Sequence, residues 1–149
     1  MSMGFLVRQH VFIATSDEQA ASVLYTGPGE SVVCDPGFVG LVVLEAILTG
    51  RSSSEVMERY PEPLAVFNEG QRFVIRLSDD LTAGLAKLRG IRGLRILRRW
   101  ARSDEVRVER LRGPDVLALA TDLRGLARST LEEDARCYLW VDVDERALF

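Results

Sequence analysis

Very few residues of this chain have side chains suited to nucleophilic catalysis. The only histidine is His10, and the two cysteines are Cys34 and Cys137. A cysteine beside a histidine can form a reactive thiolate, with an acid such as Asp35 or Asp142 orienting the imidazole. A lone histidine and small thiols are more often parts of a core, and the cysteines lack the spacing of a zinc site. We therefore expect no catalytic residue and no metal site, with a small Cys/His-dependent enzyme as the alternative function.

Two other short patterns resemble ligand sites. Asp142-Val143-Asp144 has the DxD spacing that holds a divalent cation with a nucleotide sugar, because hard cations prefer carboxylate oxygens. The segment "TGPGES", residues 26–31, has the glycines of a phosphate loop but not its G-K-[ST] ending. Two acids at a strand end and a glycine turn are the simpler interpretations, so we expect no cofactor at either place.

The stretch "KLRGIRGLRILRRWARSDE" from Lys87 to Glu105 is the strongest candidate for a binding surface. Seven cations and no acid lie between Lys87 and Arg102. At about 100° per residue, a helix here places its arginines on one arc, opposite Leu94, Leu97 and Trp100. The residues of the arc, which are the predicted partner-binding residues, are Arg92, Arg95, Arg98, Arg99 and Arg102.

The charge of the chain is unevenly distributed around this stretch. The whole chain has 19 basic and 22 acidic residues, so the part outside these seven cations has a net charge of −10. The arginine arc is either a solvated face paired with acids such as Asp79, Asp80 or those of 132–134, or a surface for an acidic protein partner. Nucleic acid is a weaker alternative, because the acidic remainder opposes binding to phosphates, and membrane binding is weaker still.

The elements that must position these residues follow from caps, turns and periodicity. Strands are predicted at 5–14, 31–34 and 137–143, and a hairpin at 64–77 with its turn at Asn68-Glu69-Gly70. Helices are predicted at 15–27 with a cap at 15–17, at 52–60 with the capping box Ser52…Glu55, from about Leu81 after the cap Ser78, and from Gly113 onward. In the last strand, Tyr138 and Trp140 should face one way, and Cys137, Leu139 and Val141 the other.

The run from Phe38 to Leu48 is predicted to be a central helix, with the Asp35 side chain as its N-cap acceptor, Pro36 at the first helical position and a stop at Thr49-Gly50. Because it is apolar on almost every face, Leu41, Leu44 and Leu48 should be buried against the sheet and the C-terminal helix. Glu45 must then reach a cation, a hydrogen-bond donor or solvent. A buried Glu45 that is paired with an arginine inside a pocket would be a stronger functional candidate than any other residue, whereas a Glu45 that points to water would be structural.

The order of several segments resembles that of the YfbM-like family of uncharacterised bacterial proteins. The segments are "MSMGFLVR", "EAILTG", "EPLAVF", "FVIRLSDDLTAGLAKLRGI" and "DARCYLWVDV". The central helix begins differently, with "DPGFVGLVV" in place of the family's acidic-aromatic-histidine start. The resemblance implies an α+β cytosolic domain and no established activity.

Composition places the chain among single-domain globular proteins. Its 149 residues are 47% hydrophobic and 28% charged. Its longest apolar run is far shorter than a membrane span, and Arg8, Gln9 and His10 interrupt the opening segment, so we expect a cytoplasmic location. We predict one α+β domain over 1–149, with a small, mostly antiparallel sheet packed against a buried central helix and a long C-terminal helix. The predicted function is a non-enzymatic protein-interaction module, immunity- or antitoxin-like, of open oligomeric state.

Overall fold

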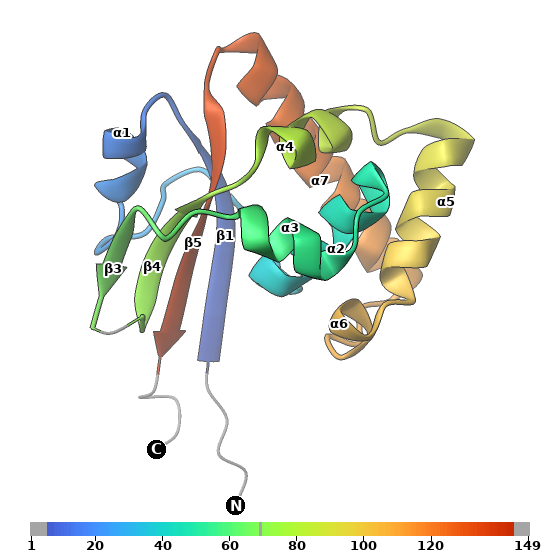
Figure 1. The fold of residues 1–149 in the computed structure, drawn as a ribbon, viewed down its shortest axis with the longest axis horizontal. Helices are drawn as coiled ribbons and strands as arrows, with labels where there is room; N and C mark the ends of the chain where they lie inside the picture. The colour runs from blue at the N-terminus through green and yellow to red at the C-terminus, as the bar shows by residue number, and fades with distance from the viewer. Residues whose placement is uncertain (1–5, 69, 145–149) are drawn as a thin grey trace, which may run out of the picture.

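The computed structural model describes residues 6–68 and 70–144, which form an α+β fold, as the sequence predicts (Figure 1). Within this part of the chain there are five strands and seven helices. Their order is β1 (Leu6–Ala14), α1 (Asp17–Ala21), β2 (Val32–Val33), α2 (Gly37–Thr49), α3 (Ser53–Arg59), β3 (Ala65–Phe67), β4 (Arg72–Arg76), α4 (Asp79–Ala86), α5 (Gly90–Ala101), α6 (Asp104–Arg107), α7 (Gly113–Glu132) and β5 (Arg136–Asp144). Each predicted element has a counterpart, and α6 is an addition that the sequence patterns did not indicate.

The sheet is antiparallel throughout, with the order β2-β1-β5-β4-β3. The last strand, β5, pairs with the whole of the first, from Leu6 opposite Asp144 to Ala14 opposite Arg136. On its other edge β5 pairs with β4 of the predicted hairpin. The chain's first and last elements therefore form the middle of the sheet.

The two faces of the sheet are covered differently. Val11 and Leu139 belong to the main core on one face, where α2 to α7 lie. Phe12, Tyr138 and Trp140 belong to a smaller cluster on the other face, which α1 covers (Figure 1). The predicted alternation along β5 is confirmed.

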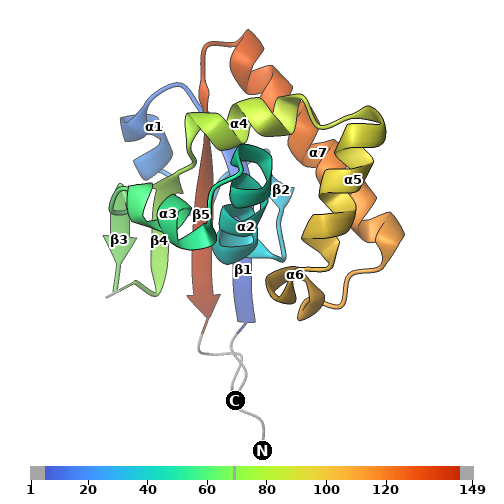
Figure 2. The ribbon, with the colours of Figure 1, turned by 45° about the vertical axis from the view of Figure 1, so that its right-hand side comes forward.

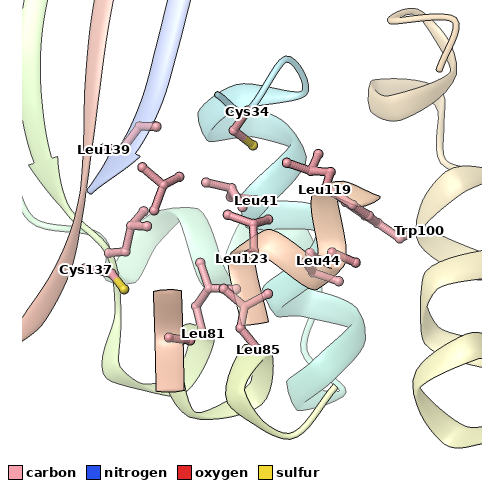
Figure 3. Packing of buried hydrophobic residues seen from close by; sticks show 14 of the residues in the cluster. Cys34, Leu41, Leu44, Leu81, Leu85, Trp100, Leu119, Leu123, Cys137 and Leu139 are labelled. Atoms are coloured by element: carbon pink, nitrogen blue, oxygen red, sulfur yellow. The ribbon is translucent and has the colours of Figure 1, made fainter. Parts of the chain in front are cut away.

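The central helix α2 is buried, as predicted. Leu41 is 1% exposed and Leu44 0%, while Leu48 near the end of the helix is only partly buried. Figure 3 shows leucines of α2, α4 and α7 converging with Leu139 of β5 in one cluster. The backbones of α2 and α7 are linked mainly through α4, which packs closely against both.

The predicted N-cap of α2 is wrong. Pro36, not Asp35, is the N-cap residue, and no side chain of the turn caps the helix. Instead, the amide oxygen of Gln9 on β1 accepts a hydrogen bond of 2.9 Å from the backbone N–H of Phe38. Gly37 has a φ of +63° and lies against the Gln9 amide, which leaves no space for a side chain. A neighbouring strand thus supplies the acceptor that the sequence assigned to the adjacent aspartate.

Candidate binding surface

Helix α5 carries the predicted arginine arc, and its apolar side anchors it to the core. Trp100 is fully buried, and its indole N–H donates a 2.8 Å hydrogen bond to the carbonyl oxygen of Gly40 in α2. Leu97 is also buried. Because both residues hold one side of α5, the opposite side faces away from the sheet at the outer edge of the molecule (Figure 2).

All five arginines of the arc are exposed, which confirms the amphipathic helix. None of them forms an ion pair within residues 6–68 and 70–144. Two of the acids proposed as internal partners are engaged elsewhere, since Asp80 pairs with Arg51 at 2.9 Å and Asp79 lies 3.7 Å from Arg76. The acids of 132–134 form no ion pair within the described residues. The arc is therefore a solvated face whose positive charge the described acids do not neutralise through contact.

Two cavities beside α5 extend the basic surface, one bordered by α2 and α4 and the other by α2 and the start of α3. The first, of about 390 Å³, is lined by Arg51, Lys87 and Arg92 together with apolar residues such as Ile96. The second, of about 370 Å³, is lined by Arg51, Arg99 and Arg102. The only acid lining either cavity is Asp80, which already pairs with Arg51.

On its other side, α5 forms a groove with α7, of about 160 Å³. Buried Leu97 and Ala120 lie at its base, and Arg89 and Arg124 line it without any acid. Leu94 and Leu117, on facing helices, are 44% and 45% exposed. This groove combines accessible apolar surface with positive charge, which sequence reasoning missed because its two walls are more than twenty positions apart.

The structure separates the candidate Cys/His pair. Cys34 is fully buried in the main core, whereas the His10 ring packs edge-on against Trp140 on the opposite face of the sheet. Burial raises the pKa of Cys34 to about 12, and burial together with the charge of Arg8 lowers the pKa of His10. A thiol that stays protonated, with the sheet between it and the imidazole, cannot act as the nucleophile of such a dyad.

Asp142, the candidate cation-binding aspartate, forms ion pairs with two arginines. Its carboxylate accepts hydrogen bonds from Arg8 and, at 3.2 Å, from Arg72. Burial alone would raise the pKa of Asp142, but the hydrogen bonds and charges of these guanidinium groups lower it. The side chain of Asp144 lies outside the described part of the structure. No group of histidine, cysteine and acidic residues suited to a metal ion occurs in residues 6–68 and 70–144.

The glycine-rich segment 26–31 forms a turn that covers the sheet. Gly27 has a φ of +80°, and a Cβ there would lie 3.4 Å from the Trp140 ring. The Trp140 indole N–H donates to the carbonyl oxygen of Leu24 at 3.0 Å. The positive φ and the nearby Trp140 ring account for Gly27, whereas Gly29 has open space around it.

Glu45 meets the condition set for it only in part, because its side chain is buried at a pocket but no arginine of the described residues pairs with it. It is 2% exposed and lies beside a pocket of about 270 Å³ that three arginines also line. Its hydrogen-bond donors are hydroxyl groups, not arginines, namely those of Tyr60 and Ser78. Burial raises the pKa of Tyr60, and the adjacent Glu45 carboxylate adds to the rise, so the phenol stays a donor. Sequence reasoning singled out Glu45 but had no signal for these partners, which come from other elements.

Among the described helices, none combines the length and apolar character needed to cross a membrane. The chain matches no family model, no curated protein and no solved structure. Its resemblance to the YfbM-like family stays a prediction.

Proposed function

We propose that this chain is a non-enzymatic binding module that recognises an acidic protein partner through α5 and the groove between α5 and α7. The observation that carries the proposal is that α5 presents five exposed arginines and also lines an apolar groove that Arg89 and Arg124 border. Protein interfaces commonly join a desolvated apolar centre to a charged rim, and rim charges speed and orient association. Within this class, we place the chain among immunity- or antitoxin-like binders, since a small domain with one charged face suits that role.

An acidic protein fits this surface better than nucleic acid does. Phosphate backbones are bound through an extended positive field, whereas the rest of this chain has a net charge of −10. An amphipathic acidic segment of a protein can place apolar side chains between Leu94 and Leu117. Its carboxylates then face Arg89 and Arg124, and neighbouring acids of the partner can reach the arc on α5. The groove has no comparable use in holding a phosphate backbone.

A synthetic helical peptide with leucines along one face and glutamates on the others tests this proposal. We expect it to bind more tightly than a scrambled peptide of the same composition, with an affinity that falls as salt rises. The double variant R95E/R99E should weaken binding at least about ten-fold and reduce the salt dependence. Leu117→Gln should weaken binding while leaving the salt dependence unchanged, because it removes apolar contact only.

The matched control is R128E/R136E, which changes the net charge equally at two exposed arginines outside α5. It should bind the peptide far better than R95E/R99E does. An equal loss of peptide affinity in the two double variants would show that only overall charge matters, and it would contradict the proposal. Tighter binding of a DNA duplex than of the peptide at the same salt concentration would favour nucleic acid instead.

A further inference from the structure

Three segments meet at Glu45, and hydroxyl groups from two of them hold one oxygen of its carboxylate. The hydroxyl of Tyr60, at the end of α3, donates to Oε1 at 2.8 Å, and the hydroxyl of Ser78 donates to the same oxygen. Ser78 also caps α4, because its Oγ accepts from the backbone N–H of Leu81 at 3.0 Å. Its backbone N–H donates to the Tyr60 oxygen at 3.2 Å. The orientation of Glu45 is therefore set by groups that are themselves fixed.

The second carboxylate oxygen, Oε2, has no donor among the described residues. Yet no buried side-chain nitrogen or oxygen of the described residues lacks a hydrogen-bond partner. Oε2 must therefore reach open space, and the adjoining pocket of about 270 Å³ provides it. Because Glu45 is only 2% exposed, its carboxylate has lost most of its hydration, so a positively charged donor in the pocket is bound strongly.

The rest of the pocket presents charges of both signs. Three acids and three arginines line it, so their formal charges cancel. Arg51 and Arg76 already face Asp80 and Asp79, respectively. Arg59, at the C-terminal end of α3, is exposed and has no ion pair within the described residues. The pocket thus offers a buried acceptor, Oε2 of Glu45, and an available guanidinium, that of Arg59.

We propose that this pocket binds a small zwitterion of the amino-acid type. Its ammonium group donates to Oε2 of Glu45, and its carboxylate pairs with the guanidinium of Arg59. A neutral molecule with separated charges matches a lining whose charges are balanced but separated, whereas a simple anion would meet the Glu45 carboxylate. The two proposed contacts, Glu45 and Arg59, lie outside the partner surface on α5, although Arg51 and Asp80 line both this pocket and a cavity beside α5.

The first experiment is a titration of the labelled chain with ω-amino acids from glycine to 6-aminohexanoate, followed through its backbone amide resonances. One chain length should bind best and should shift the amides around Tyr60, Leu77 and Ser78 in a saturable way. Pentylamine and pentanoate each lack one charge of 5-aminopentanoate, and both should bind more weakly than the best zwitterion. Binding of pentylamine as tight as that of the best zwitterion would overturn the proposal. The absence of saturable shifts at these amides would also overturn it.

Substitutions at Glu45 and Arg59 test separately the contact to the ammonium group and the contact to the carboxylate of the zwitterion. Glu45→Gln keeps the shape and an acceptor for Tyr60 and Ser78, and we expect it to reduce zwitterion affinity at least about ten-fold. Arg59→Gln should weaken the zwitterion while leaving pentylamine unaffected. The control Arg128→Gln should change neither, since Arg128 does not line the pocket. Melting temperatures identify any variant that fails to fold, and unchanged zwitterion binding by folded Glu45→Gln would overturn the proposal.

Discussion

At the residue scale, Glu45 and Asp142 are buried carboxylates whose charges are stabilised in different ways. Asp142 is 3% exposed and lies between two guanidinium groups, those of Arg8 and Arg72. Glu45 has neutral hydroxyl donors on one oxygen and open space at the other. A carboxylate held by two cations has little capacity left for a ligand, while one that is half satisfied can bind one. Of these two carboxylates, Glu45 is therefore the one that can hold a ligand.

The pairing of Asp142 predicts how stability depends on pH. Because its pKa in the folded chain lies below the ordinary value of 3.8, ionised Asp142 stabilises the fold at higher pH. That contribution is lost as pH falls through the lowered pKa. We expect the wild type to be more stable than Asp142→Asn at neutral pH, with a difference that shrinks below pH 3.8. Urea unfolding of both proteins across this range is the measurement, and a difference that does not change with pH would contradict it.

Both cysteines should be unreactive toward alkylating reagents in the folded chain. Burial raises the pKa values of both thiols, that of Cys34 to about 12, and both side chains lie inside the core. Iodoacetamide near pH 8, about the ordinary range for a thiol, should therefore label neither residue until urea unfolds the chain. Mass spectrometry counts the labels. Rapid labelling of Cys34 in the native state would contradict this prediction and would favour the alternative of a Cys/His-dependent enzyme.

At the element scale, close packing of a glycine helps to position α5. Gly93 is buried against the preceding turn, and a Cβ there would lie 3.1 Å from the carbonyl carbon of Leu88. Gly125, on the exposed side of α7, has nothing within 4 Å of such a Cβ. The two glycines thus share a helical setting but differ in the space around them.

This difference predicts opposite responses to alanine. Gly125→Ala should raise the free energy of unfolding by about 0.5–1 kcal/mol, because alanine loses less backbone entropy in a helix. Gly93→Ala should give no gain or a loss, since the contact with the Leu88 backbone offsets the same helical advantage. Chemical denaturation of both variants measures the two values. If Gly93→Ala raised the free energy of unfolding as much as Gly125→Ala, α5 would not need the close approach of Gly93 to the Leu88 backbone.

At the scale of the whole molecule, the core joins the sheet to a layer of helices. Leu44 of α2 is fully buried in the cluster that also contains residues of α4, α5, α7 and β5 (Figure 3). The sheet beneath it depends on the pairing of β1 with β5, the first and last strands of the fold. Stability is therefore shared between parts of the chain that are far apart in sequence.

Truncation of Leu44 measures that shared stability. Leu44→Ala should lower the free energy of unfolding by about 2–5 kcal/mol, because it removes buried apolar contact and leaves a cavity. Leu131→Ala is the matched control, since Leu131 is 58% exposed, and it should change stability by no more than about 0.5 kcal/mol. Urea unfolding supplies both values. A loss below about 1 kcal/mol at Leu44 would mean that α2 is peripheral.

The sequence by itself determined the local elements and the character of each face. Capping by Ser52 and Ser78, the hairpin turn at Asn68 and the stop at Gly50 are interactions between residues close in the chain. The arginine arc of α5 and the alternation along β5 follow from helical and strand periodicity alone. For that reason these features could be predicted without knowing which elements meet.

Tertiary structure decided which of these residues meet. It placed His10 and Cys34 on opposite faces of the sheet, moved the cap of α2 to Gln9, and put Arg8 and Arg72 around Asp142. It also brought Tyr60 and Ser78 to Glu45, and α5 beside α7. Each of these contacts joins separate elements, so it depends on the sheet order and on how the helices pack over it. Local periodicity and caps specify how each segment folds, but the shared burial of their apolar faces determines how they are arranged.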